Sequence, residues 1–496
     1  MIKILCVLLA LAMLLSFTAC DSEPEVELNV PEGKPTYADD KELELYAYAG
    51  PRSGGYRWNV DGQTHPDDPA GGWDSFITEK DFQDYIDCGF TFLYPEYDAK
   101  AYRNAADLQV PFEQSTLYEY MSLAEKMNID VVVQDDTVTK LTRGTSPLMD
   151  DDMKAYVKQL IDDLSTFECF KGLTLADEPK VNNYRIFEQV TNFARSVKAD
   201  IELITCMLPV YGAPHLNVGT GTTADYQEYI DDYGKLDGHF IYDFYPLRWS
   251  PVAGNYLKRQ WFQNLEMVAN SSKTNGFETG VVIQSCAYGG VGNEGIADHA
   301  RSVLTQADVG YQLYTSLAYG AKTIGYFTYW QHRSEGHPHI TESFYDGMVM
   351  NPKENGMESV KTDTYYAVKA ANLEVKKFDH VLMSFDWEGT IGLKGTDKFK
   401  TMIDIPEYTN PRIAEATSTE DAIIGCLKDA NGYDGFMIVN ALEPSLEQSV
   451  SVTVKFREAS SAIAYVNGEE TEIQLEDGSY TFNLDAGAGV FVIPIK

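Results

Sequence analysis

The sequence is poor in basic residues, in cysteine and in long apolar runs. Only 39 Lys and Arg stand against 75 Asp and Glu among 496 residues, which leaves a formal net charge of -36. A field of this sign repels phosphate backbones and anionic lipid heads, so we expect no nucleic-acid partner. We interpret the excess acid as a solvated surface, because net charge bears on solubility rather than on fold.

Cysteine is too sparse and too irregularly spaced to form a disulfide framework. Of the seven cysteines, two lie in the N-terminal segment, and the other five are an odd number without C-x-x-C spacing. Most of these five lie in or beside apolar runs such as LITCM and AIIGCL, which indicates buried free thiols rather than disulfides or a zinc site. The five are Cys88, Cys169, Cys206, Cys286 and Cys426.

The one long apolar run lies at the N-terminus. Lys3 precedes ILCVLLALAMLLSF and small residues, the pattern of an export signal, and the run is too short for a comfortable membrane span. The ending SFTAC resembles a bacterial lipoprotein signal, in which the cysteine, here Cys20, becomes the lipidated first residue; Phe17 departs from the usual Leu. We therefore expect a signal over 1–20, a flexible tether over 21–42, and a location in the bacterial cell envelope, with the membrane reached only through a lipid anchor. Plain secretion is the alternative.

Two folded units are expected, since 496 residues exceed what one core usually organises. From residue 43 to 378, short apolar runs alternate with amphipathic stretches whose apolar residues recur every three or four positions. Eight such runs predict a (β/α)8 barrel. A doubly wound open sheet is the alternative, but no G-x-G-x-x-G follows the first run. The runs begin at Leu43, Phe90, Ile129, Gly172, Ile201, His239, Gly280 and Lys322.

The pattern changes after residue 378. Short alternating segments follow, separated by turn dipeptides such as Asn431-Gly432, Asn467-Gly468 and Asp477-Gly478. These segments predict an antiparallel β-sandwich over residues 379–496. The predicted fold class is therefore α/β, a (β/α)8 TIM barrel followed by a C-terminal antiparallel β-sandwich.

Acidic and aromatic residues gather at the predicted carboxyl ends of the strands, where barrels of this kind build their active sites. Carboxylates accept hydrogen bonds from hydroxyl groups and rings pack on the C–H face of a sugar, so this mouth suits a neutral polyhydroxylated ligand. Carboxylate pairs are also what glycosidic hydrolysis requires. Beside the acids Glu178 and Asp243, we predict substrate contacts from Tyr94, Glu96, Asp136, Asp177, Tyr245, Gln284, Tyr329 and Trp330.

Three segments, LTLADEPK, YDFYPL and LYTSLAYGAKTIGYFTYW, resemble the large clan of (β/α)8 glycoside hydrolases that includes β-galactosidases and cellulases. The resemblance covers residues 43–378 and implies cleavage of glycosidic bonds in an extracellular oligo- or polysaccharide. In that clan an Asn-Glu-Pro motif ends the fourth strand, and its Glu is the general acid/base. Glu178 occupies the matching place, with Asp177 instead of the Asn.

The clan's nucleophile is a Glu at the end of strand seven, where this chain has Gln284 in VVIQSCAYGG. A neutral amide cannot form the usual glycosyl ester, which leaves three interpretations open. Another rim carboxylate substitutes, with Asp243 first and Asp136 and Glu96 after it; the enzyme inverts, with its carboxyl groups about 6.5 to 9.5 Å apart; or the barrel binds glycan without cleaving it. We predict Glu178 and Asp243 as the catalytic pair, with a non-catalytic glycan-binding lipoprotein as the alternative.

Each of these residues also has a structural interpretation. Glu178 could be a helix N-terminal acid, Asp243 could satisfy backbone donors in a turn, and Trp330 could pack in the core. A protein that acts mainly through its sandwich, as an interaction module, is a third class.

Neither a metal nor a cofactor is predicted. The segment HRSEGHPHI places three histidines close together after the eighth run. Metal-dependent barrel hydrolases of the amidohydrolase type, however, resemble one another in a His-x-His at strand one, and LYAYAG has none. A serine hydrolase is disfavoured as well, because the sequence contains no G-x-S-x-G elbow.

Overall fold

The computed structural model describes eleven stretches of the chain. Cys20, Glu96 and the histidines of HRSEGHPHI lie outside the described residues, and Asp136 is described only in its backbone. The described stretches are residues 28, 30–51, 77–94, 111–144, 148–215, 222–286, 299–301, 304–330, 347–350, 359–393 and 405–496.

Eight parallel strands form one sheet in the order β1-β11-β9-β6-β5-β4-β3-β2. The two outer strands of this order meet as well, because the backbone N–H of Thr91 donates to the carbonyl of Leu45 at 2.8 Å and that of Gly50 to the carbonyl of Tyr94 at 3.2 Å. The sheet therefore closes into the predicted barrel, and all eight predicted strands are confirmed. Their bounds are β1 (Glu44–Ala47), β2 (Phe92–Leu93), β3 (Asp130–Gln134), β4 (Phe170–Asp177), β5 (Glu202–Met207), β6 (His239–Asp243), β9 (Glu278–Gln284) and β11 (Thr323–Phe327).

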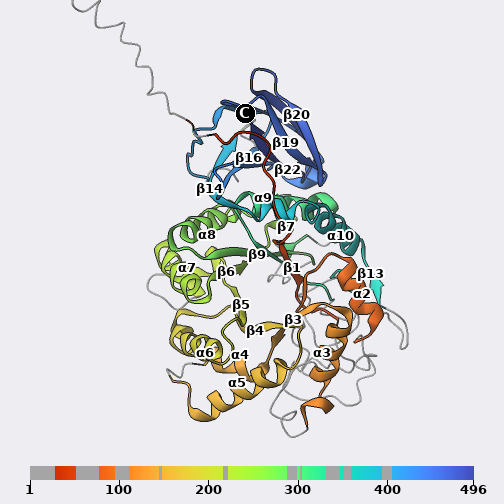
Figure 1. Cartoon of the computed structure of the whole chain (residues 1–496), viewed down its shortest axis with the longest axis vertical. Helices are drawn as coiled ribbons and strands as arrows, with labels where there is room; N and C mark the ends of the chain where they lie inside the picture. Colours follow the sequence, from red (N-terminus) through yellow and green to blue (C-terminus); the bar gives the residue numbers. More distant parts are fainter. Residues whose placement is uncertain are drawn as a thin grey trace, which may run out of the picture.

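Helices surround the strands on the outside of the barrel (Figure 1). Within the described ranges, none of the helices combines the length and the apolar character needed to cross a bilayer. They are α2 (Glu79–Asp87), α3 (Thr116–Met127), α4 (Asp136–Thr142), α5 (Asp151–Leu164), α6 (Tyr184–Val197), α7 (Thr223–Asp237), α8 (Trp261–Asn275), α9 (Gln306–Ala318), α10 (Asp363–Val375) and α11 (Asp379–Leu382).

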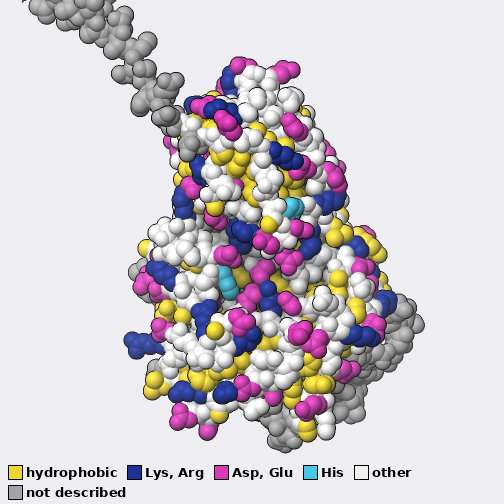
Figure 2. All heavy atoms as spheres, in the orientation of Figure 1, with side chains coloured by type: hydrophobic (Ala, Val, Ile, Leu, Met, Phe, Trp, Pro, Cys, Tyr) yellow, Lys and Arg dark blue, Asp and Glu magenta, His cyan; other side chains and the backbone are white. Residues whose placement is uncertain are grey.

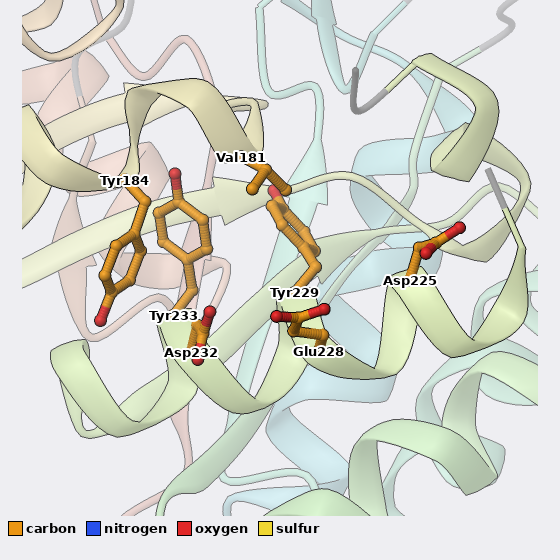
Figure 3. A pocket seen from close by; sticks show the side chains of 7 residues that line it. All are labelled: Val181, Tyr184, Asp225, Glu228, Tyr229, Asp232 and Tyr233. Atoms are coloured by element: carbon orange, nitrogen blue, oxygen red, sulfur yellow. The ribbon is translucent and has the colours of Figure 1, made fainter. Parts of the chain in front are cut away.

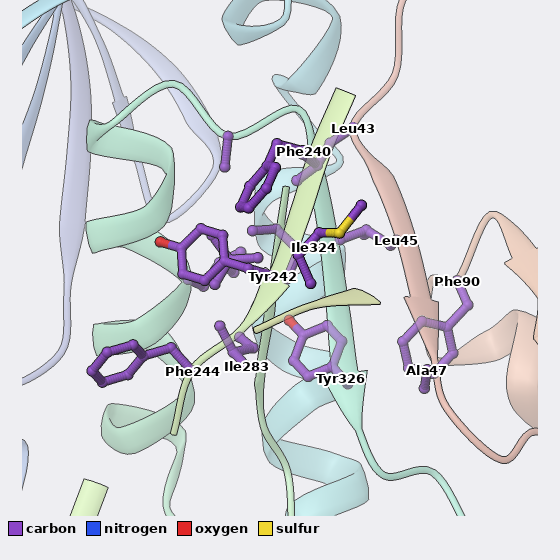
Figure 4. Close-up of a cluster of buried hydrophobic side chains, with 14 of the residues drawn as sticks. Leu43, Leu45, Ala47, Phe90, Phe240, Tyr242, Phe244, Ile283, Ile324 and Tyr326 are labelled. Carbon is purple, nitrogen blue, oxygen red and sulfur yellow. The ribbon is translucent and has the colours of Figure 1, made fainter. Parts of the chain in front are cut away.

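Successive side chains of each strand point to opposite faces of the sheet, so the apolar side chains form two layers. On β1, Leu45 and Ala47 belong to the layer between strands and helices, together with Phe240 and Tyr242 of β6, Ile283 of β9 and Ile324 of β11 (Figure 4). Tyr46 belongs to a second cluster inside the barrel, which includes Ile204, Cys206 and Ile241. The barrel interior is thus filled by side chains rather than open as a pore.

The amino ends of the strands are joined by ion pairs. Lys171 Nζ lies 2.9 Å from Glu44 Oε1 and 3.0 Å from Glu202 Oε2, which ties β1, β4 and β5 together. Elsewhere on the surface, acidic and basic side chains are interspersed over the face that Figure 2 shows. This mixture agrees with a solvated acidic surface.

The C-terminal part is a β-sandwich, as predicted. Its two antiparallel sheets enclose an apolar core that includes Ile424, Ile438 and Val452. At Asn467-Gly468 the φ angles are 50° and 76°, which matches the tight hairpin turn predicted there. One sheet contains β14 (Phe385–Leu393), β16 (Ala422–Asp429), β17 (Asp434–Asn440), β22 (Gly489–Ile495), β19 (Ser461–Val466) and β20 (Glu469–Gln474); the other contains β15 (Ile413–Ser418), β18 (Val450–Phe456) and β21 (Ser479–Leu484).

The sandwich packs directly on helix α9 of the barrel (Figure 1). A Cβ atom at Gly425 of β16 would lie 2.0 Å from the carbonyl oxygen of Ala318, and one at Gly487 would lie 2.0 Å from that of Ala307. Only glycine permits such close contact between backbones. Because every residue from Asp308 to Ala318 is buried, removal of the sandwich would expose a barrel helix.

Part of the segment predicted as a tether lies along the sandwich. The Tyr37 hydroxyl donates to Asp429 Oδ2 at 3.1 Å, its ring lies 5.6 Å from that of Phe385, and Lys34 forms an ion pair with Glu470. These contacts fix residues between the N-terminal segment and β1 on the surface of the sandwich.

Candidate active site

The end of strand β4 departs from regular pairing. Thr174 is paired with Ile204 and Asp177 with Cys206, so three steps along β4 match two along β5. This β-bulge alters the direction in which the last residues of the strand point. The backbone N–H of Glu178 then donates to the carbonyl of Cys206 at 2.7 Å. The bulge therefore places Glu178 at the carboxyl mouth of the barrel, beyond the last pair of the ladder.

Glu178 adopts a left-handed backbone conformation, with φ of 50°. This conformation costs an L-residue roughly 1–2 kcal/mol, and strained residues of this kind cluster at functional sites. Neighbouring contacts hold the segment. Arg143 Nη2 donates to the carbonyl oxygen of Asp177 at 3.0 Å, and the backbone N–H of Lys180 donates to Asn183 Oδ1 at 2.9 Å. Asn183 in turn donates to the carbonyls of Arg143 and Gly144, both at 2.9 Å.

Glu178 is an exposed residue at the mouth, and its carboxyl is partly surrounded by acid and by protein. Partial burial, followed by the charge of Asp177, raises the pKa of Glu178 to about 7, against the opposing effect of Arg143. Arg143 forms an ion pair with Asp177, whose Oδ2 lies 3.3 Å from Nη2. Glu178 is therefore a carboxylic acid that holds a proton near neutrality and can exchange it with solvent.

Asp243 ends strand β6 on the side that faces the barrel interior, two residues after the inward Ile241. Its side chain is 7% exposed, and its Oδ1 has no hydrogen-bond partner among the described residues. Burial raises the pKa of Asp243, and the charges of Glu178 and Asp177 raise it further, while a hydrogen bond from Tyr245 lowers it. The fold thus brings Glu178 and Asp243, the two predicted acids, into electrostatic contact.

Two neighbouring carboxyl groups at one mouth cannot both ionise easily. The charge of Glu178 is among the causes that raise the pKa of Asp243, so the ionisation of Glu178 disfavours that of Asp243, and this repulsion favours a state with one proton on the two groups. A pair with one proton contains one acid and one base at the same time.

Gln284 is fully enclosed at the end of strand β9. Its backbone N–H donates to Gln312 Oε1 at 2.9 Å, and its Nε2 donates to the carbonyl oxygen of Arg301 at 3.3 Å. Its Oε1 has no hydrogen-bond partner among the described residues. The backbone of Gln284 thus joins β9 to helix α9, and its side-chain amide joins β9 to the segment at Arg301.

The predicted aromatic residues lie deeper than a surface platform would. Tyr94 is 1% exposed and its ring lies 4.6 Å from that of Tyr48; Tyr245 is 8% exposed and lies 5.7 Å from Phe327. The rings of Tyr329 and Trp330, each 1% exposed, belong to the apolar core. The structure places these two rings in the core rather than at an open mouth. After β11 the chain stays alongside the segment that follows β1, where the backbone N–H groups of Tyr329 and Trp330 donate to the carbonyls of Tyr48 and Ala49.

The acid pair after strand β3 is divided between two elements. Asp135 is fully buried and is the N-cap of α4, where its carboxylate accepts from the backbone N–H groups of Thr137 and Val138 and from the Tyr156 hydroxyl. Asp135 is thus structural. Asp136 begins the helix, and its assignment to substrate binding stays a prediction.

Sequence reasoning missed a small sheet and an ion cluster beside the mouth. Strands β7 (Leu247–Ser250), β8 (Gly254–Leu257) and β10 (His299–Ala300) form a three-stranded antiparallel sheet that follows Asp243. Next to β10, the buried Arg301 forms ion pairs with Asp308 of α9 and with Glu443 of the sandwich. The sandwich therefore contributes a charge close to the segment that binds Gln284.

Two hollows are lined by neither Glu178 nor Asp243. One, of about 40 Å³, opens on the outer surface between α7 and the short helix η3 (Val181–Asn183) (Figure 3). The other, of about 340 Å³, lies between α8 and β14, and its Lys273 is paired with Glu388 at 3.1 Å. Among the described residues, no group of three or more His, Cys, Asp or Glu side chains is arranged to hold a metal ion.

The left-handed turn at Glu178 predicts that a glycine variant at this position is more stable than an alanine variant. Glu178→Gly and Glu178→Ala both remove the carboxyl, but only Gly adopts positive φ without strain, so we expect Glu178→Gly to be the more stable by roughly 1 kcal/mol. Urea unfolding of the two variants measures this difference. At Glu188, inside α6, the order should reverse, because Ala is the better helix former. Equal stability of the two Glu178 variants would contradict the strain.

No protein-family model and no curated protein matches the sequence. Solved structures similar to this chain include an α-amylase from Anoxybacillus, with 12% identity, 92% of this chain and 98% of that chain covered, and a TM-score of 0.48. Another is described as a glycoside hydrolase, with 12% identity, 95% and 99% coverage, and a TM-score of 0.47. A GH30 endoxylanase from Clostridium papyrosolvens C71 shows 11% identity, 84% and 92% coverage, and a TM-score of 0.40.

Proposed function

We propose that the protein is a glycoside hydrolase that cleaves an extracellular oligo- or polysaccharide, with Glu178 and Asp243 as its two catalytic carboxyl groups. One observation carries the proposal: the carboxyl mouth of the barrel holds two acids whose ionisations oppose each other, one of them exposed with a pKa of about 7 and the other buried with an oxygen that has no described partner. Glycosidic hydrolysis needs such a pair, one group protonated and the other ionised.

Glu178 would act as the general acid. Its pKa near 7 leaves a substantial protonated fraction at neutral pH, and its exposure lets it reach the glycosidic oxygen of a bound sugar. The proton moves from Glu178 to this oxygen as the bond to the anomeric carbon breaks. After the sugar leaves, the ionised Glu178 can accept a proton from water.

Asp243 would act in its ionised form. Burial and the charges of Glu178 and Asp177 oppose the charge on Asp243, whereas a backbone hydrogen bond and one from Tyr245 favour it. A proton on Glu178 removes the opposing charge of that group. The Oδ1 of Asp243 is then available either to attack the anomeric carbon or to activate a water molecule. Asp177 and Arg143, at the same mouth, provide an acceptor and donors for sugar hydroxyl groups.

Binding without cleavage is the second candidate function. It is favoured by Gln284, an enclosed amide at the strand end where the resemblance places a nucleophile. In that case the protein would retain glycans through the same mouth and release no product.

One experiment separates these functions. The full-length protein is run through gels that contain individual polysaccharides, and the same polysaccharides are incubated with it and assayed for new reducing ends. Retardation together with new reducing ends supports hydrolysis, whereas retardation without product supports binding alone. If no neutral polysaccharide retards the protein and none yields new reducing ends, both functions are contradicted.

A further inference from the structure

Helix α7 directs a row of tyrosines at the barrel. Tyr226, Tyr229 and Tyr233 recur at helical spacing of three and four residues and are 0%, 1% and 1% exposed. The ring of Tyr229 lies 4.9 Å from that of Tyr233, and the ring of Tyr233 lies 5.1 Å from that of Phe187 on α6. The rings are therefore packed on several sides, and their hydroxyl groups have little freedom to move.

Two of these hydroxyls bind consecutive carbonyl groups directly after Glu178. The Tyr229 hydroxyl donates to the carbonyl oxygen of Pro179 at 2.8 Å, and the Tyr233 hydroxyl donates to that of Lys180 at 2.9 Å. Figure 3 shows the two rings side by side on α7, with both hydroxyls directed at the segment that carries Val181. The Tyr226 hydroxyl donates to the carbonyl of Leu208, after β5, at 2.9 Å and to neither carbonyl after Glu178. The Tyr229 hydroxyl also accepts from the backbone N–H of Leu208, at 3.4 Å.

The turn at Glu178 needs such support. Its φ of 50° is unfavourable for a glutamate, so the turn persists only where the surrounding structure holds it. The backbone N–H of Glu178 is bound to β5 on one side, and the two tyrosines bind the carbonyls on the other side. We propose that Tyr229 and Tyr233 are positioning residues, which hold the peptide groups after Glu178 and so place its carboxyl beside Asp177 and Asp243.

This inference rests on the proposed catalytic role of Glu178, but it also predicts a property that is independent of hydrolysis. We call the hydroxyl groups of Tyr229 and Tyr233 the Glu178 clamp. If this clamp is lost, the turn can relax toward solvent, and the Glu178 carboxyl then moves away from the acids and from the protein that surrounds it. Its pKa should fall from about 7 toward its ordinary value of 4.5.

The test compares Tyr229→Phe, Tyr233→Phe and the double variant with Tyr226→Phe. All of them remove a buried hydroxyl from the same helix, so a loss of thermal stability is expected throughout. Only the Glu178 clamp variants should lose kcat, by roughly 3- to 10-fold for each hydroxyl, with KM little changed, because a misplaced acid weakens the transition state more than substrate binding.

A second readout uses the protein labelled with 13C at glutamate carboxyl groups, with the Glu178 signal assigned by its absence in Glu178→Gln. We expect its titration midpoint near pH 7 in the wild type and in Tyr226→Phe, and a lower midpoint in Tyr229→Phe and Tyr233→Phe. An unchanged midpoint and unchanged kcat in the folded clamp variants would overturn the inference, as would equal effects in Tyr226→Phe. If the wild type hydrolyses no glycan but the midpoints shift as expected, the proposed function fails while the clamp stands.

Discussion

Glu178→Gln should reduce kcat on a natural oligosaccharide by about 10²- to 10⁴-fold, the usual contribution of a general acid. The amide keeps the size of the side chain and its backbone conformation but has no acidic proton for the departing oxygen. Because protonation matters less when the leaving group is already stable as an anion, the loss should be much smaller on aryl glycosides with acidic phenols. Steady-state kinetics on both substrate types measures the difference.

The direction in which activity changes with pH tests the same role of Glu178. The pKa of Glu178 is raised to about 7, so activity that needs its proton should decline as the pH rises above 7. Glu178→Gln should lose this alkaline limb together with its activity. Glu188→Gln, which removes an exposed acid from α6, is the matched control and should retain both. Full activity of Glu178→Gln on the natural substrate would refute the role.

Stability should respond to pH through the same carboxyl. Since the folded pKa of Glu178 lies above its ordinary value of 4.5, the folded state binds more protons than the unfolded state between about pH 4.5 and 7. Its contribution to stability is therefore present below this window and is lost as the pH rises through it. Relative to the wild type, Glu178→Gln should resist urea better at pH 8 than at pH 4, as expected where an active site trades stability for function.

The architecture could be predicted from sequence because it depends on local patterns. Apolar runs of strand length, alternating with amphipathic helices, located all eight barrel strands, and turn dipeptides such as Asn467-Gly468 located hairpins of the sandwich. The same patterns located Glu178 and Asp243 at strand ends. Strands β7 and β8 were not predicted, because they are four residues long and lie among Pro and Gly residues.

The finer features of the site depend on contacts between distant segments. The bulge in β4 is defined by the pairing of β4 with β5, and no pattern within LTLADEPK predicts it. In sequence, the tyrosines of α7 are typical of an apolar helix face. Only the folded structure shows that the hydroxyls of two of them, Tyr229 and Tyr233, donate to the carbonyls of Pro179 and Lys180. Burial of Trp330 likewise depends on where the chain goes after its strand. Sequence patterns thus identify which residues carry chemistry, whereas tertiary contacts decide how each is held.

Asp243→Asn should cost at least about 10³-fold in kcat, because the variant lacks the charge that stabilises or attacks the anomeric carbon. It should also lower the pKa of Glu178, since the two carboxyls no longer compete for one proton. The alkaline limb of the residual activity should move toward lower pH. Asp232→Asn, an acid on the outer face of α7, is the control and should change neither quantity.

Small anions can then distinguish the two possible roles of Asp243. In Asp243→Gly, azide fits the space left by the carboxylate; if Asp243 is the nucleophile, azide should restore turnover and yield a glycosyl azide of inverted configuration. If Asp243 instead activates water, the wild type should release an inverted sugar, which NMR of the first product detects. The double variant with Glu178→Gln should be little worse than the poorer single one, because the pair acts as a unit. Strictly additive losses would mean that Glu178 and Asp243 act independently, and the second carboxylate would then have to be sought elsewhere at the mouth.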